Sequence, residues 1–217
     1  MVGVVAIDVV GGTALILVWY LCFLRYNRRK SAEVLQRIKT AFSGHAQIVG
    51  VRWTGASRFS IRLRVLSNLF QHASILVQLH PRELPLNWLW TRVRKRQETL
   101  TFKADLEYPP SFNLEVHNHR WRGRTRRFPR DQRRMALGHC GPFVLTTRSE
   151  WQREITTMMA ALVASRDCDF LSVSFRRSSP HFSVVVPLQS LSPESECESE
   201  MFEVLRELAA CASASRF

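Results

Sequence analysis

The sequence predicts an α+β fold, in which an N-terminal transmembrane helix is followed by a mostly antiparallel sheet domain with flanking helices. Three observations support this prediction. Residues 2–24 are almost entirely apolar. Several later segments alternate between apolar and polar residues, which is the pattern of half-buried antiparallel strands. Other segments repeat their apolar residues at helical spacing.

Residues 2–24 are the expected transmembrane anchor. Asp8 is their only charged residue, and it lies near the N-terminal end, within reach of the headgroup layer. A helix of these 23 residues measures about 34 Å at ~1.5 Å per residue, which is enough for a hydrocarbon core of ~30 Å. A cleavable signal peptide would need basic residues ahead of its apolar run, and none precede this one.

The residues after the anchor set its expected orientation, because basic residues beside a span remain on the cytoplasmic side. The membrane-proximal charges are Arg25, Arg28, Arg29 and Lys30. We therefore expect a single-pass protein with an exported N-terminus and a cytoplasmic C-terminal domain. The five cysteines, odd in number and without a pattern, also suit a reducing compartment.

Residues 25–44 are expected to form a juxtamembrane basic segment and helix. Apolar residues share one face of this helix, and Gly44 then supplies a stop. That face consists of Val34, Leu35, Ile38, Ala41 and Phe42.

Residues 45–217 are expected to form a single α+β globular domain. Alternation predicts strands at 57–65, 99–107 and 112–116, and weaker patterns suggest strands at 47–53, 73–79 and 142–147. A short helix is expected after Pro85. We expect its Trp88 and Trp90 to pack in the core, with insertion into a membrane interface as the alternative.

In the C-terminal third, the residue pattern predicts strands and helices in the order β-α-β-β-α. Ser149 and Gln152 form a capping box for a helix over 150–164. A hairpin over 169–176 and 182–188 follows, and Ser192 caps a final helix.

The charge balance changes sign along the domain. Residues 25–134 hold 24 Lys and Arg against 7 Asp and Glu, a net charge of +17, whereas residues 135–217 have a net charge of −3. A subdivision of the domain near 135–141 is therefore the alternative to a single unit.

A basic patch is the most informative candidate site. Dense arginines attract phosphate groups, in lipid headgroups or in nucleic acid. The patch consists of Arg92, Arg94, Lys95, Arg96, Arg120, Arg122, Arg124, Arg126, Arg127, Arg130, Arg133 and Arg134. On strand 57–65, Arg58, Arg62 and Arg64 project to one face and extend this basic surface.

No catalytic or metal site emerges from the sequence, and we expect no cofactor. His117, His119 and His139 lack the spacing of a zinc site, and no nucleophile or phosphate-loop motif is present. The leading hypothesis is a non-catalytic, membrane-anchored interaction or scaffolding module. Its basic face would contact anionic lipid or an acidic protein partner. A membrane-tethered nucleic-acid-binding protein is the first alternative, and an enzyme of unknown type is the second.

Overall fold

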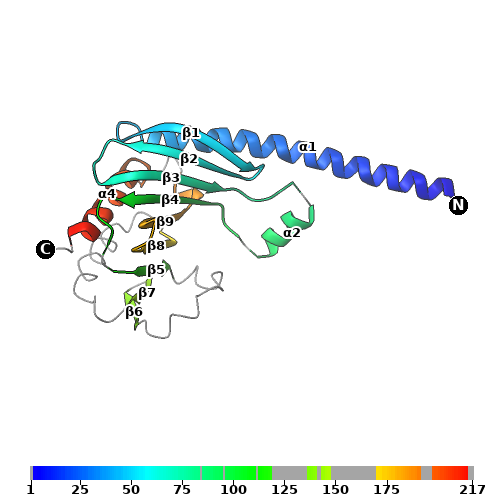
Figure 1. Ribbon diagram of the computed structural model, residues 1–217. Coiled ribbons are helices and arrows are strands. Elements are labelled where there is room, and N and C mark those ends of the chain that lie inside the picture. The colour runs from blue at the N-terminus through cyan, green and yellow to red at the C-terminus, as the bar shows by residue number, and fades with distance from the viewer. Residues whose placement is uncertain are drawn as a thin grey trace.

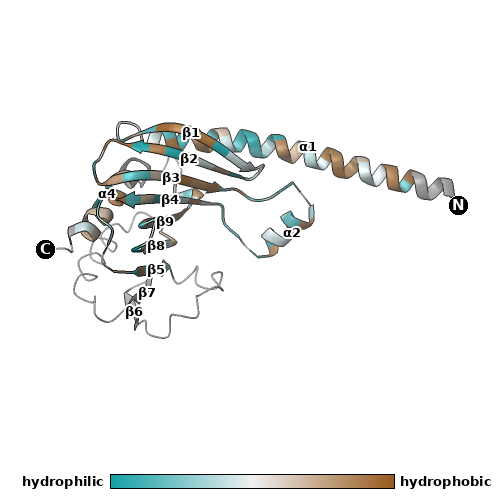
Figure 2. Cartoon of the chain, in the orientation of Figure 1, coloured by the Kyte–Doolittle hydropathy of each residue, from teal (hydrophilic) through white to brown (hydrophobic). Residues whose placement is uncertain are grey.

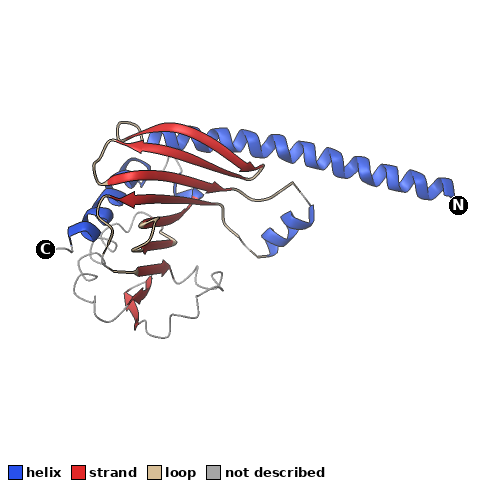
Figure 3. Ribbon diagram, viewed as in Figure 1, coloured by secondary structure: helices blue, strands red, loops and turns tan. Residues whose placement is uncertain are grey.

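The computed structural model describes residues 2–83, 85–94, 96–110, 112–118, 136–140, 143–147, 170–191 and 197–214. These residues form a long N-terminal helix, one large antiparallel sheet and shorter helices (Figures 1 and 3). The predicted α+β class with an N-terminal apolar helix is therefore confirmed. The helix expected over 150–164, like the cap at Ser192, lies outside the described residues.

The helices are α1 (Val2–Ala41), α2 (Pro85–Val93), the 3-10 helix η4 (Leu188–Leu191) and α4 (Cys197–Ala214). The strands are β1 (Ala46–Gly55), β2 (Arg58–Val65), β3 (Phe70–Gln78), β4 (Thr99–Leu106), β5 (Leu114–Asn118), β6 (Ala136–Cys140), β7 (Phe143–Thr147), β8 (Ser172–Phe175) and β9 (Phe182–Pro187).

Helix α1 is continuous, but its N-terminal half is apolar and exposed whereas its C-terminal half packs on the core. It is the one described helix long and apolar enough to span a membrane, and an 18-residue window in it has a mean hydropathy of 2.0 with nothing buried by the rest of the protein. This half projects away from the sheet and is mostly apolar (Figure 2). The other half joins the core through Val34, Ile38 and Ala41.

The nine described strands form one sheet in the order β1-β2-β3-β4-β9-β8-β5-β7-β6. Every described pairing is antiparallel, and the alternation in β2, β4 and β9 places one side of each of these strands on the core. Two features were not predicted. Strand β6 has no clear alternation, and the β8–β9 hairpin lies between β4 and β5, although these two strands follow each other directly in the chain.

The core lies between one face of the sheet and the helices α1 and α4. Phe42, just after α1, stacks on Phe102 of β4 with ring centroids 6.1 Å apart. It also meets Phe202 of α4 edge-on at 5.8 Å. All three side chains are almost fully buried, so Phe42 joins both helices to the sheet.

The sheet has two distinct ends, and α1 runs from one to the other. At the near end, from which α1 projects, Gln78 of β3 pairs with Thr99 of β4, and α2 lies between these two residues in the chain. At the far end, Ala46 after α1 pairs with Val65. Figure 1 shows α2 beside the near end.

We predict that Phe42→Ala destabilises the domain by about 3–5 kcal/mol, because it opens a cavity between α1, β4 and α4. Urea unfolding of the full chain in detergent, followed by tryptophan fluorescence, measures this loss. Leu66→Ala is the control: its side chain is 65% exposed, and the change should stay within about 0.5 kcal/mol. Equal effects of the two substitutions would contradict the packing described for Phe42.

Candidate functional site

The candidate site is the place where α1 leaves the sheet. Side chains from α1, from α2 and from the segments on either side of α2 meet there, and we call this cluster the exit collar. The exit collar consists of Trp19, Tyr26, Lys30, His80, Arg82, Trp88 and Glu98.

One half of the exit collar is aromatic. The indole Nε1–H of Trp19 donates a hydrogen bond of 3.1 Å to the carbonyl oxygen of Arg82. Trp88 of α2 meets Trp19 edge-on, with ring centroids 6.1 Å apart. The guanidinium of Arg82 lies 4.8 Å above the ring of Tyr26, a cation–π contact. Helix α2 and the segment before it are thus held against the point where the apolar half of α1 ends.

The other half of the exit collar is centred on the carboxylate of Glu98. Oε2 lies 2.5 Å from Lys30 Nζ of α1. Oε1 lies 2.9 Å from His80 Nδ1 and 3.6 Å from an Arg82 guanidinium nitrogen. Burial on its own would raise the pKa of Glu98, but the side chains of His80 and Lys30 more than offset it and hold the pKa at about 2. The carboxylate therefore stays ionised and joins three segments of the chain.

Helix α2 presents an apolar face away from the exit collar. Leu86, Leu89, Trp90 and Val93 are exposed by 81, 53, 55 and 72%. Thr91, on the opposite side, is 3% exposed. The expectation that both tryptophans pack in the core is wrong for Trp90. Hydrophobic residues in a short segment predict burial on average, and the sequence carries no sign of which face of α2 the sheet covers.

Basic residues surround the exit collar. Arg25, Arg28 and Arg29 are exposed on α1, and no described carboxylate pairs with them. Lys30 differs, because Glu98 neutralises it. On α2 the guanidinium of Arg92 lies 5.4 Å above Trp88, and that of Arg94 lies 4.2 Å above Trp90.

Of the remaining residues of the predicted patch, only Arg96 lies within the described part of the chain. Arg96, at the start of the segment leading to β4, is exposed, and its backbone N–H donates to the Thr91 carbonyl at 3.1 Å. Lys95 and the eight arginines of 120–134 lie outside the described residues. The part of the patch they form remains a prediction.

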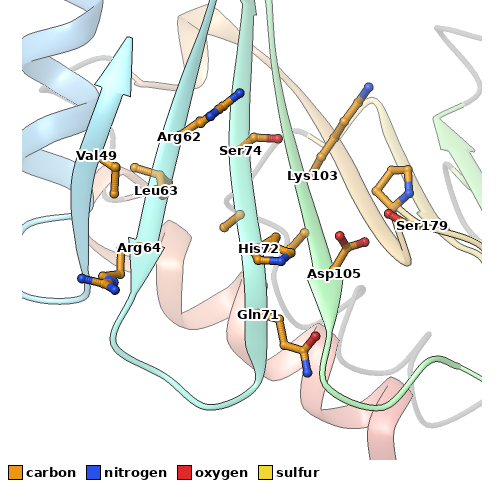
Figure 4. A pocket seen from close by; sticks show the side chains of 13 residues that line it. Val49, Arg62, Leu63, Arg64, Gln71, His72, Ser74, Lys103, Asp105 and Ser179 are labelled. Atoms are coloured by element: carbon orange, nitrogen blue, oxygen red, sulfur yellow. The ribbon is translucent and has the colours of Figure 1, made fainter.

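A second basic surface lies on the uncovered face of the sheet (Figure 4). Arg62, Lys103 and Asp105 from β2 and β4 line a cavity of about 660 Å³, together with Arg64 and Ser179. No described carboxylate pairs with the two arginines or with Lys103. We call this cavity the far groove, because its lining strands approach the end of the sheet opposite the exit collar.

The described histidines do not support a metal site. No group of three His, Cys, Asp or Glu side chains among the described residues could hold a metal ion. His117 instead lies 3.6 Å from a carboxylate oxygen of Glu115, which also pairs with Arg176 at 2.7 Å. His117 lowers the pKa of Glu115 to about 2 against the effect of burial, with help from Arg176. His119 and the side chain of His139 are outside the described part of the chain.

Sequence reasoning missed the central residue of the exit collar. Glu98 is an isolated acidic residue in the sequence, with no other carboxylate close to it in the chain. A signal was available, since Glu98 follows Arg92, Arg94 and Arg96 within six residues and is the nearest carboxylate to them on that side. Its partner Lys30 is 68 residues away and only the fold brings the two together.

No protein-family model matches the chain, and no curated protein matches its sequence. Among solved structures, the fold is similar to the crystal structure of the mycobacterial trehalose monomycolate transport factor A, TtfA, at 10% sequence identity and a TM-score of 0.45. The alignment covers 82% of this chain and 93% of the other. So remote a likeness concerns the arrangement of the chain alone.

We predict that Glu98→Gln destabilises the full chain by about 1.5–3 kcal/mol at neutral pH, since hydrogen bonds to an ionised group are lost and Lys30 is left without its partner. The folded-state pKa of about 2 is below the ordinary value of 4.5. The stabilisation is therefore complete above pH 4.5 and disappears as the pH falls towards 2.

Urea unfolding in detergent at several pH values between 7 and 3 tests this expectation. The difference between the wild type and Glu98→Gln should narrow as the pH falls below 4.5. Glu107→Gln, at an exposed position after β4, is the matched control and should show no such dependence. A gap that stays constant over this range would refute the ionised state assigned to Glu98.

Proposed function

We propose that this chain is a non-catalytic, membrane-anchored interaction module. Helix α1 spans the bilayer with its N-terminus exported, and the sheet domain remains on the cytoplasmic side. The observation that carries the proposal is the continuity of α1. A single helix passes from an uncovered apolar half into the core, and the exit collar braces it where the two halves meet.

The charges beside the span support contact with anionic headgroups. Arg29 follows Leu24 by five residues, about 8 Å along a helix at ~1.5 Å per residue. That distance is about one Debye length at physiological ionic strength. Arg25, Arg28 and Arg29 thus lie in the zone where each charge gains ~1 kcal/mol from an anionic surface.

The far groove supports an acidic protein segment as a second partner. Arg64 is six residues along β2 from Arg58, which is at the near end, so the two are about 20 Å apart at ~3.3 Å per residue. Arg62 and Lys103 are four residues from Arg58 and from Thr99, about 13 Å from the near end at ~3.3 Å per residue. All three cations are thus more than one Debye length from headgroups at the near end, and Arg64 is more than two. The three cations of the far groove would therefore be available to a partner in the cytoplasm, for which the interaction module would act as a membrane-bound scaffold.

The topology is tested by cysteine labelling in cells. In a variant without its five cysteines, Leu66→Cys introduces a thiol at an exposed position of the domain. We expect this thiol to resist an impermeant maleimide in intact cells and to react after lysis. A cysteine in a short polar tag added before residue 1 is the control for the other side and should react in intact cells. Labelling of Leu66→Cys without lysis would overturn the cytoplasmic placement.

The lipid contact is tested by spin-labelled lipids around the reconstituted full chain. We expect phosphatidylglycerol to be enriched over phosphatidylcholine beside the protein. Replacing Arg25, Arg28 and Arg29 with glutamine should abolish most of this preference, because it removes ~1 kcal/mol per charge. Replacing Arg62 and Arg64 in the far groove should leave it unchanged. Equal lipid selectivity in both variants would argue against headgroup contact at the exit collar.

A further inference from the structure

The apolar face of α2 is largely exposed in the described part of the chain. Leu86, Leu89, Trp90 and Val93 follow the spacing i, i+3, i+4, i+7 and so line one side of the helix. All four are more than half exposed. Four large apolar side chains gathered on one exposed helix face mark an interaction surface, whereas scattered exposed apolar residues do not.

One side of α2 packs against the protein, so the apolar face has a defined direction. Thr91 is buried and its hydroxyl donates to the Trp88 carbonyl at 2.8 Å. Trp88 packs edge-on against Trp19 of α1. Since Trp88 and Thr91 are three residues apart, they hold one side of α2 against the protein and turn the opposite side outward.

The position of α2 along α1 indicates which surroundings the outward face of α2 meets. Trp19 belongs to the last turns of the apolar half of α1, just before Arg25 and the other exposed arginines. The contact between Trp88 and Trp19 therefore places α2 level with the end of the candidate span, where headgroups meet acyl chains. Figure 1 shows α2 beside α1 at that end of the domain.

The composition of α2 also matches a membrane interface better than a protein groove. Tryptophan is enriched at the boundary between headgroups and acyl chains, and Trp90 is on the exposed face. Arg92 and Arg94 lie over the rings of Trp88 and Trp90. Cations beside an apolar face are the pattern of helices that lie in the plane of an anionic membrane surface.

We infer that α2 is an interfacial helix, which inserts Leu86, Leu89, Trp90 and Val93 into the boundary between headgroups and acyl chains beside α1. This inference rests on the proposed span. It gives the domain a second membrane contact, so that the domain cannot rotate freely about α1. The far groove is then held away from the bilayer and towards the cytoplasm.

The test is nitroxide labelling of the full chain, without its native cysteines, in vesicles of phosphatidylcholine and phosphatidylglycerol. Single labels are placed by Leu89→Cys and Val93→Cys on the exposed face of α2. Leu15→Cys, 70% exposed in the apolar half of α1, reports on the span, and Leu66→Cys reports on water. The measurement is the accessibility of each nitroxide to oxygen relative to a water-soluble nickel complex.

We expect the labels on α2 to resemble Leu15→Cys, with an oxygen-to-nickel ratio several-fold above that of Leu66→Cys. If Leu15→Cys is in lipid while the labels on α2 match Leu66→Cys, the span stands and the interfacial helix is wrong. Labels on α2 shielded from both reagents would mean that protein covers this face, which also overturns the inference. A water-exposed Leu15→Cys would overturn the proposed span and the inference together.

The chemistry of the α2 face is tested separately by Leu89→Asp. We expect this substitution to return the Val93→Cys label to the accessibility of Leu66→Cys and to leave Leu15→Cys in lipid. Asn87→Asp, which adds the same charge at an exposed position off the apolar face, is the matched control and should leave the Val93→Cys label in lipid. A Val93→Cys label that stays in lipid despite Leu89→Asp would contradict insertion of this face.

Discussion

The part-buried carboxylate of Glu98 forms the interaction on which the arrangement at the near end of the sheet depends. It pairs with Lys30 of α1, and with His80 and Arg82 from the segment between β3 and α2. A buried ion pair contributes little net stability compared with apolar packing, because both charges must be desolvated. Loss of one partner is costly, however, since the other is then left buried and uncompensated. The exit collar therefore specifies a geometry: it fixes the angle at which α1 leaves the sheet and keeps α2 beside it.

This geometry concerns two parts of α1 that differ in composition and in burial. An 18-residue window of the apolar half contains no buried residue, whereas the other half is amphipathic and buries Val34, Ile38 and Ala41 against the sheet. Because the helix is continuous, a tilt of its apolar half would also tilt the domain. The aromatic contacts of Trp19 and Tyr26 lie where the two halves join, which is where bending would otherwise concentrate. Tryptophan and tyrosine also favour the interface, so the same residues suit both tasks.

The sequence predicted most of the described helices and strands, with β6 as an exception, but it did not predict which strands lie side by side. Strict alternation identified β2 and β4, because each has one face on the core and the other in water. Alternation says nothing about which strands pair, and so the insertion of β8 and β9 between β4 and β5 had no signal. The same limit applies to the candidate site. The basic residues near the span follow from composition, but the pairing of Lys30 with Glu98 and the exposed face of Trp90 depend on contacts made across the fold. Residues 120–134, where the sequence places most of the patch, lie outside the described part of the chain.

The two basic surfaces lie at opposite ends of the sheet, which implies that they would bind different partners. In the proposed arrangement, charges beside the span would act on headgroups within about one Debye length, whereas all cations of the far groove are more than one such length from the near end of the sheet. A domain attached to the membrane only through α1 could rotate about that helix, and the far groove would then point in many directions. The proposed second contact at α2 would remove that freedom before a partner binds. Preorganisation of this kind lowers the entropic cost of binding without adding a contact to the partner. The apolar face of α2 would thus matter for recognition even though it lies at the end of the domain farthest from the far groove.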